Sequence, residues 1–349
     1  MEDGQRDIVV YRNEHGYCAW PDVKILPNGE WVIAFCEAMR RPEITHQDPT
    51  AHNALVRSAD GGESWDAYPL VVPSYDFWGM DDPGLTLLSN GDLLMNAYRH
   101  AYLAREVVER EDASRYRPVG PFPWAQAYDG TFVHRSTDGG RTWRETFDVA
   151  VSPFDRGCTL RPMVELPNGE LLLACYDETR LPCPCFVLRS ADGGRTWGQA
   201  STVAADDEIS FYEPAIVRLE SGRIIAILRT HDPGAYYQYQ CESGDDGRTW
   251  TQPCRTPMWG HPAHLLVLQD GRLLCVYGHR RKPFGIRACL SSDDGQTWDV
   301  HNELVIRDDF LNGDLGYPTS VQLEDGTIFT AYYGQHEGVT CIQGSYYRA

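Results

Sequence analysis

Ser190-Ala191-Asp192-Gly193-Gly194-Arg195-Thr196-Trp197 (SADGGRTW) is one of five copies of the pattern Ser-x-Asp-x-Gly-x-Thr/Ser-Trp in this chain of 349 residues. We call this pattern the Asp box, and the other copies begin at Ser58, Ser136, Ser243 and Ser291. The Asp side chain can accept hydrogen bonds from the backbone amides that follow it, the Gly accepts a positive φ, and the Trp covers the turn with an apolar face. Each Asp box is therefore predicted to be a stapled β-hairpin, which is a folding element without chemistry of its own.

A second series of turns, each containing a glycine, alternates with the Asp boxes. Each turn precedes an apolar run such as residues 31–35 or 224–228. The six turns are Pro27-Asn28-Gly29, Ser89-Asn90-Gly91, Pro167-Asn168-Gly169, Glu220-Ser221-Gly222, Gln269-Asp270-Gly271 and Glu324-Asp325-Gly326. Alternating hairpins give four antiparallel strands in each unit of about fifty residues, which is typical of a propeller. The sequence therefore predicts an all-β fold, a six-bladed β-propeller.

The repeats extend from one end of the chain to the other, so residues 1–349 are predicted to form a single propeller domain. The interval from Gly91 to Gly169 is the longest, which indicates an insertion around residues 101–128. A short exposed helix is expected within it, over residues 105–117. The last unit lacks an Asp box, and residues 7–11 are expected to supply its outer strand, which closes the ring without free sheet edges.

The composition excludes some classes of partner. Lys plus Arg number 31 against 50 Asp plus Glu, and this net charge of −19 argues against binding to nucleic acid or to an anionic membrane. No apolar run approaches the ~20 residues that span a bilayer, and the N-terminal MEDGQRD is acidic where a signal peptide is basic and then apolar. The eleven cysteines are odd in number, and several lie in apolar strand patterns typical of buried free thiols. We expect a cytoplasmic protein.

No metal or other cofactor is expected. Cys183-Pro184-Cys185 is the only close cysteine pair, and it has no second pair or neighbouring His with metal-ligand spacing. The Asp boxes use their carboxylates in turns.

Both kinds of hairpin lie on one face of a four-stranded antiparallel blade, so function is expected at the opposite mouth of the ring. Counting back nine residues from each hairpin glycine reaches the first strand there: Trp20, Asp82, Leu160, Glu213, Pro262 and Tyr317, with Arg161 and His264 one or two positions further on. Counting forward seven or eight reaches Glu37, Arg99, Asp177, Arg229, His279 and Tyr333, with Arg280 and Arg281 just beyond. The loop of the first unit adds His46 and Asp48. Some of these charges could be ordinary rim ion pairs, and the histidines could simply line a polar mouth.

Repeated Asp boxes in a six-bladed ring resemble the sialidase (neuraminidase) superfamily over essentially the whole chain. The resemblance implies that Asp48, in His46-Gln47-Asp48-Pro49, is a general acid and base. It also implies that Glu213, in Tyr212-Glu213-Pro214, assists a nucleophilic Tyr317, in Gly316-Tyr317-Pro318. The expected catalytic residues are thus Asp48, Glu213 and Tyr317.

Three arginines clamp the substrate carboxylate in that superfamily. Arg229 matches one of them and Arg281 another, with Arg280 and Arg287 as competing candidates for the latter. The third belongs to an Arg-Ile/Val-Pro motif that here is Ala19-Trp20-Pro21, so Ala19 replaces the arginine, and Arg161, Arg99 or Arg40 could reach in from elsewhere. The substrate-binding residues that we expect are Arg229, Arg281, Arg161, His46, Asp82, Trp20 and His264.

The resemblance implies exo-acting, retaining cleavage of a terminal sialic acid or related acidic sugar, so a carbohydrate is the expected partner. A Tyr nucleophile suits an anomeric carbon that carries a carboxylate, because an anionic nucleophile would be repelled there. Two alternatives are open. A polysaccharide lyase acting on uronic acids could use Tyr317, His264 and Arg281, and the loss of the arginine at Ala19 also fits a propeller that binds glycans without catalysis.

Overall fold

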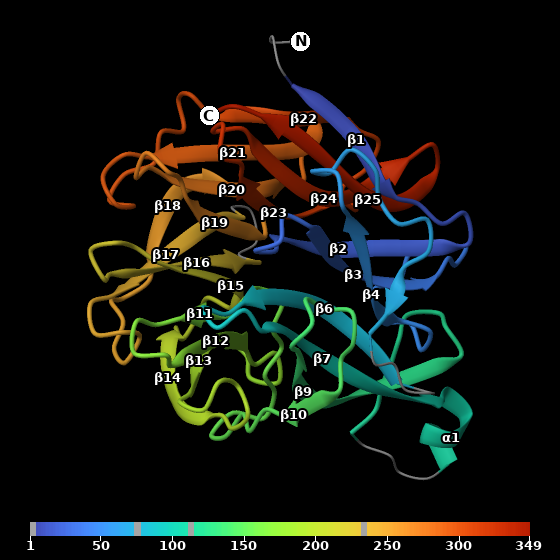
Figure 1. Cartoon of the computed structure of the whole chain (residues 1–349). Helices are drawn as coiled ribbons and strands as arrows, with labels where there is room; N and C mark the ends of the chain where they lie inside the picture. The colour runs from blue at the N-terminus through green and yellow to red at the C-terminus, as the bar shows by residue number, and fades with distance from the viewer. Residues whose placement is uncertain (1–4, 73–77, 111–114, 232–235) are drawn as a thin grey trace.

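The computed structural model describes residues 5–72, 78–110, 115–231 and 236–349. Its strands form six antiparallel sheets that radiate from a central axis, as Figure 1 shows. The predicted six-bladed β-propeller with four antiparallel strands in each blade is confirmed. No helix in the part of the chain described is long and apolar enough to cross a membrane.

The first three blades follow one another along the chain. Blade one contains β2 (Gly16–Ile25), β3 (Trp31–Met39), β4 (His52–Ser58) and β5 (Leu70–Val71). Blade two contains β6 (Trp78–Leu87), β7 (Leu93–Ala104), β9 (Trp124–Ser136) and β10 (Glu145–Asp148), and β8 (Arg117–Pro118) pairs with β9. Blade three contains β11 (Val164–Glu165), β12 (Leu171–Tyr176), β13 (Cys185–Ser190) and β14 (Gly198–Ala204). The helix α1 (Arg105–Arg110) follows β7 and lies at the periphery of the ring (Figure 1).

The last three blades complete the circle. Blade four contains β15 (Phe211–Arg218), β16 (Ile224–Thr230), β17 (Tyr237–Ser243) and β18 (Cys254–Trp259). Blade five contains β19 (Ala263–Val267), β20 (Leu273–His279), β21 (Phe284–Ser291) and β22 (Leu304–Phe310). Blade six contains β23 (Gly316–Gln322), β24 (Ile328–His336), β25 (Val339–Tyr347) and, as its outer strand, β1 (Arg6–Tyr11). The pairing of β1 with β25 confirms that the N-terminal strand closes the ring.

The second strand of each blade begins with a mostly apolar, buried run because neighbouring blades cover both of its faces. In β16, for example, the run from Ile224 to Leu228 is completely buried. The side chains of adjacent blades interdigitate into apolar clusters, and the largest of these surrounds the axis. Packing between blades therefore fixes the inner strands in place.

The five Asp boxes have the predicted role. In the third box the Ser190 hydroxyl donates to Asp192 Oδ1 (2.8 Å) and accepts from the Gly194 amide (2.9 Å). The Thr196 amide and hydroxyl donate to the two oxygens of Asp192, at 2.9 and 2.6 Å. The same four bonds recur in each of the other boxes. The carboxylates of the Asp boxes are thus committed to turns.

Candidate active site

The innermost strands share a distortion at the mouth opposite the Asp boxes. Trp20, Asp82, Glu213 and Tyr317 each precede a proline, and the strand register shifts at each of them. All four have left-handed backbone angles, with φ of 57°, 42°, 49° and 49° respectively. Such angles cost about 1–3 kcal/mol per non-glycine residue and concentrate at functional sites.

Blades three and five have a proline at the corresponding place, and the residues before these prolines are Arg161 and His261. Counting back nine residues had pointed to Leu160 and Pro262 instead. The distance to the hairpin glycine differs by one residue in these two blades, so a fixed count misses the position. We call the set Trp20, Asp82, Arg161, Glu213, His261 and Tyr317 the inner ring, with one residue contributed by each blade.

Tyr317, Glu213 and Arg229 form a hydrogen-bonded trio in the inner ring. The Tyr317 hydroxyl donates to Glu213 Oε1 at 2.5 Å, and Arg229 Nη1 donates to both Glu213 oxygens at 2.7 Å. Arg229 Nη1 also lies 3.3 Å from the Tyr317 oxygen. Glu213 and Arg229 meet because they flank one hairpin, on the antiparallel strands β15 and β16.

The electrostatic surroundings keep the proton of the trio on Tyr317 and not on Glu213. Burial and the neighbouring Glu213 charge raise the pKa of Tyr317 well above its ordinary value, although Arg229 opposes this. Burial would also raise the pKa of Glu213, but Arg229 more than compensates and holds it below the ordinary value. The resting state is therefore a neutral phenol that donates to an ionised carboxylate.

The arginines of blade five differ in where they point. The Arg280 guanidinium lies 5.6 Å from the centre of the Tyr317 ring and donates to the Leu315 carbonyl oxygen. Arg281 instead stacks on Trp259 at 4.3 Å and donates to His279 Nε2, and Arg287 is paired with Glu303 at 3.8 Å. The contact to the nucleophile candidate is therefore made by Arg280, whereas the sequence had favoured its neighbour, because both residues follow the end of β20 and the turn there sends their side chains to different partners.

Arg161 is the one substitute that approaches the trio among the arginines considered for the position lost at Ala19. Its Nη1 donates to the Pro318 carbonyl oxygen at 2.9 Å, whereas its buried Nε and Nη2 have no partner in the described structure. Burial lowers the pKa of Arg161, but the Asp22, Glu213 and Tyr317 groups oppose this. Arg99 is paired with Asp129, and Arg40 donates to the Gly338 carbonyl oxygen.

His264 lies deeper, below the inner ring. It is buried near Arg161 and Lys24, and burial followed by these cations lowers its pKa well below the ordinary value, so the ring is neutral. Its Nδ1 atom has no partner within the described ranges.

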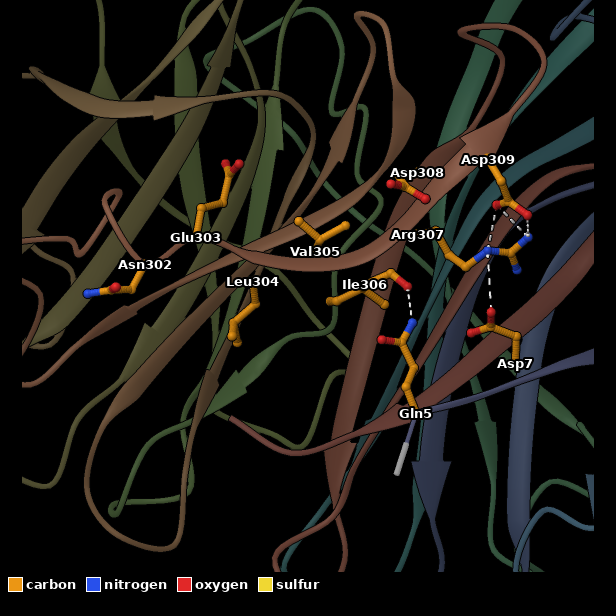
Figure 2. Close-up of a pocket in the computed structure, with 10 residues that line it drawn as sticks. All are labelled: Gln5, Asp7, Asn302, Glu303, Leu304, Val305, Ile306, Arg307, Asp308 and Asp309. Atoms are coloured by element: carbon orange, nitrogen blue, oxygen red, sulfur yellow. Dashed lines mark hydrogen bonds and ion pairs between the residues drawn. The ribbon is translucent and has the colours of Figure 1, made fainter. Parts of the chain in front are cut away.

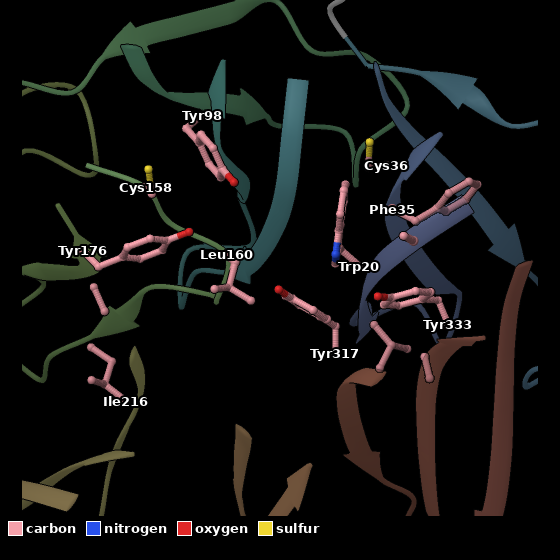
Figure 3. Close-up of a cluster of buried hydrophobic side chains, with 14 of the residues drawn as sticks. Trp20, Phe35, Cys36, Tyr98, Cys158, Leu160, Tyr176, Ile216, Tyr317 and Tyr333 are labelled. Atoms are coloured by element: carbon pink, nitrogen blue, oxygen red, sulfur yellow. The ribbon is translucent and has the colours of Figure 1, made fainter. Parts of the chain in front are cut away.

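Asp82 is the second carboxyl group of the inner ring. The Tyr98 hydroxyl donates to its Oδ2 at 2.9 Å, while the buried Oδ1 is without a partner among the residues described. Burial, then the charges of Asp81 and Glu213, raise the pKa of Asp82 well above its ordinary value. Asp82 therefore holds a proton and can donate it in a hydrogen bond. Figure 3 shows the hydroxyl groups of Tyr98, Tyr176 and Tyr317 pointing toward the same central space.

Aromatic rings wall one side of this space. The centre of the Trp20 ring lies 6.1 Å from that of Tyr317 and 5.4 Å from that of His46. Tyr333 packs against Tyr317 at 5.9 Å (Figure 3). His46 and Trp20 are therefore brought to the mouth together, as expected.

Asp48 stands apart from the other predicted catalytic residues. Arg41 donates to both of its oxygens, at 2.6 and 3.1 Å, and the Thr50 amide and hydroxyl donate to Oδ1. Burial alone would raise the pKa of Asp48, but these hydrogen bonds lower it below the ordinary value. A general acid must hold a proton before the reaction, and this environment keeps Asp48 ionised.

A further aromatic wall, which the sequence analysis did not single out, borders the mouth at blades four and five. Tyr212 stacks on His231 at 4.5 Å, and Tyr236 lies 5.6 Å from His261 and 6.2 Å from Trp259. Tyr212 precedes Glu213 directly, and this adjacency is the one signal that could have predicted its position.

The cavity drawn in Figure 2 lies away from this chemistry. It has a volume of about 630 Å³ and follows the outer strands β22 and β1, where Gln5, Asp7 and residues 302–309 line it. Arg307 pairs with Asp7 and Asp309 inside it. None of the predicted site residues lines this cavity. Within the described ranges, no group of three or more His, Cys, Asp or Glu side chains could hold a metal ion.

Fold and site together define a class, the sialidase-like six-bladed propellers with Asp boxes. More narrowly, the chain belongs to the BNR repeat-like domain family, whose model matches residues 118–330. No curated protein matches the chain.

Among solved structures, the chain is similar to a protein of unknown function from Dyadobacter fermentans, with 32% identity, a TM-score of 0.88 and 99% of each chain covered. It is also similar to the Hadza microbial sialidase Hz136, with 18% identity and a TM-score of 0.72 over 98% of this chain and 68% of that one. An α-L-arabinanase from Penicillium chrysogenum, solved with arabinobiose, matches at 13% identity and a TM-score of 0.69, covering 98% and 97%. The last two similarities concern the fold.

Proposed function

We propose that this protein is an exo-acting, retaining glycosidase that releases a terminal acidic sugar, with Tyr317 as the nucleophile. The observation that carries the proposal is the trio in which Tyr317 donates to Glu213 at 2.5 Å while Arg229 binds both of them. A tyrosine paired in this way with a buried carboxylate is an activated nucleophile. The similarity of the fold to sialidases and an arabinanase supports the reaction class.

The trio accounts for the first chemical step. As the Tyr317 oxygen attacks the anomeric carbon, its proton passes to Glu213, so no free phenolate is needed despite the raised pKa of Tyr317. Arg229 Nη1 contacts both groups and stabilises the charge that moves between them. Water then attacks the anomeric carbon from the face opposite Tyr317, which the leaving group had occupied, and the bond to Tyr317 breaks. The two inversions together retain the anomeric configuration.

Two features favour an acidic sugar. A neutral phenol is preferable to a carboxylate as nucleophile where the anomeric carbon itself bears a carboxylate, because like charges repel. Arg229 and Arg280 lie at Tyr317, and Arg161 has two buried N–H groups without a partner in the described structure. An arginine fork of this kind selects a planar anion. With Ala19 in place of one arginine, we assign the third contact to Arg161.

Release of 4-methylumbelliferone from the ketosides of N-acetylneuraminic acid and its deaminated analogue, and from uronic-acid glycosides, tests the proposal. We expect the wild type to cleave at least one acidic glycoside and Tyr317→Phe to cleave none. Tyr347→Phe is the matched control, because this buried tyrosine bonds Thr330 in another apolar cluster and should leave turnover intact. Equal activity of Tyr317→Phe and wild type would overturn the nucleophile assignment.

The two alternative functions, a polysaccharide lyase and a non-catalytic glycan-binding protein, have less support. The lyase set of Tyr317, His264 and Arg281 is not assembled in the described structure, because Arg281 stacks on Trp259 and His264 is buried near Arg161. A purely glycan-binding role does not account for the short hydrogen bond between Tyr317 and Glu213. An unsaturated, ultraviolet-absorbing product from uronic-acid oligomers would favour the lyase.

A further inference from the structure

The loop between β3 and β4 carries His46 and Asp48, two side chains with opposite surroundings. Asp48 is buried and accepts four hydrogen bonds from Arg41 and Thr50, which leaves it ionised and enclosed. The His46 side chain is 38% exposed, and among the residues described its polar contact is made by Nε2. The loop therefore presents the imidazole, and not the carboxylate, to solvent and substrate.

His46 lies over the candidate active site. Its ring is 5.4 Å from that of Trp20, which in turn lies 6.1 Å from that of Tyr317, so Trp20 neighbours both the imidazole and the nucleophile candidate. The charge of Asp81, from the first strand of blade two, also acts on His46. The imidazole is thus on the mouth side of the inner ring, which is the side from which a leaving group departs.

Asp314 orients His46 from blade six. Its Oδ1 lies 3.2 Å from His46 Nε2 and also accepts hydrogen bonds from the hydroxyl groups of Tyr17 (3.0 Å) and Tyr333 (3.1 Å). Burial would raise the pKa of Asp314, but the contacts with His46 and the two tyrosines lower it, so it is an anion. An anion at Nε2 keeps the proton on that nitrogen and leaves Nδ1 as the position that exchanges a proton.

We propose that His46, held by Asp314, is the general acid and base of this enzyme, in the role that the sequence had suggested for Asp48. The inference rests on the proposed function. In the first step the His46 imidazolium gives its Nδ1 proton to the glycosidic oxygen as the bond from that oxygen to the anomeric carbon breaks, while Tyr317 attacks and its proton passes to Glu213. In the second step neutral His46 takes a proton from water. The water oxygen attacks the anomeric carbon, the bond to Tyr317 breaks, and Glu213 returns the proton to the phenolate.

Two ketosides of the same sugar test the assignment, one with a 4-methylumbelliferyl leaving group and one with a methyl leaving group. Methanol is the poorer leaving group and depends on protonation, whereas the aryl group leaves largely without it. The variants are His46→Phe, which keeps a ring against Trp20, and His46→Gln, which keeps a polar group should the first fail to fold. His52→Gln is the matched control, since this histidine follows the same loop and pairs with Glu37.

We expect kcat/KM of both His46 variants to fall about 10²–10⁴-fold on the methyl ketoside and less than about tenfold on the aryl ketoside. The aryl ketoside should also give a burst of 4-methylumbelliferone equal to the enzyme, because the second step lacks its base. His52→Gln should match the wild type on both substrates. Equal losses on the two ketosides, or a loss that depends on the leaving group in Asp48→Asn only, would overturn the role of His46 and leave the proposed function standing. A wild type that cleaves neither ketoside nor any other acidic glycoside would overturn both.

Discussion

The two ends of the propeller differ in the residues that occupy equivalent positions of the blades. At one end, five Asp boxes place the same residues in the same hydrogen bonds, and every box carboxylate is saturated. At the opposite mouth, the six residues before the inner prolines are all different: Trp20, Asp82, Arg161, Glu213, His261 and Tyr317. The two ends share one architecture, so the repeat itself explains the first end but not the second.

The difference lies in which polar groups are left without partners. Buried polar groups are normally hydrogen-bonded, yet Trp20, Asp82, Arg161 and His261 of the inner ring each have a buried nitrogen or oxygen without a partner in the described structure. Four of the six inner positions also carry left-handed backbone angles. Left-handed angles also occur in two Asp boxes, at Asp246 and Asp294, but Asp adopts them more readily than the bulky Trp20 and Tyr317 do. The mouth therefore combines strain at bulky residues with several unpaired polar groups that a ligand can satisfy.

The largest difference that we predict is in kcat/KM, between variants with one glutamate substituted at each end of blade four. Glu213→Gln removes the proposed base at the mouth and should lower kcat/KM about 10²–10⁴-fold. Glu242→Gln alters the pair with Arg223 near the Asp box and should leave kcat/KM within about twofold of the wild type. Steady-state kinetics on the best acidic glycoside measures both values of kcat/KM. A comparable fall in the two variants would contradict a catalytic role for Glu213 at the mouth.

Substituting the arginine of each of these two pairs should lower the free energy of unfolding by different amounts. Arg229→Met leaves Glu213 buried without its cation, which should cost about 3–5 kcal/mol. Arg223→Met at the other end breaks a half-exposed ion pair and should cost about 0–1 kcal/mol. Urea unfolding of both variants gives the comparison. Similar midpoints would mean that the trio contributes little to the fold.

Removing one Asp-box carboxylate should have a smaller effect, and on stability alone. Asp192→Ala deletes the acceptor for Ser190 and Thr196, and the loss of such turn bonds should cost about 1 kcal/mol. Trp197, which covers this turn, reports the unfolding by fluorescence. Kinetic constants should stay at the wild-type values. A large loss of activity in Asp192→Ala would imply that the boxes do more than fold the blades.

The sequence was sufficient for the fold because each blade repeats its own turn chemistry. The count of six blades, the hairpin role of Ser190–Trp197 and the closure by β1 all follow from local residues, and the structure confirms them. Glu213 and Arg229 were predictable as a pair, because they flank one hairpin in antiparallel strands. Local rules suffice where the partners lie on neighbouring strands.

Contacts between distant loops were beyond such rules. The choice between Arg280 and Arg281 depends on which way the chain turns after β20, and the capture of Asp48 by Arg41 depends on the path of an irregular loop. Asp314 meets His46 across 268 residues of sequence. The proline after each inner-ring residue was nevertheless visible in the sequence, and it identifies Arg161 and His261 where the fixed count of nine failed.

The two ends should also respond to pH with opposite sign, which is the smallest effect we predict. Hydrogen bonds from Thr249 lower the pKa of the Asp-box residue Asp245 to about 2, so its contribution is present above the unfolded pKa of about 3.9 and is lost as the pH falls toward 2. Burial raises the pKa of Asp82, so its contribution is present at low pH and is lost as the pH rises through the folded pKa. Relative to the wild type, Asp245→Asn should therefore become less stable as the pH rises from about 2 to 5. Asp82→Asn, which mimics the protonated acid, should become relatively more stable as the pH rises further. Urea midpoints across this range measure both trends, and parallel curves for the two variants would contradict the assignment of a proton to Asp82.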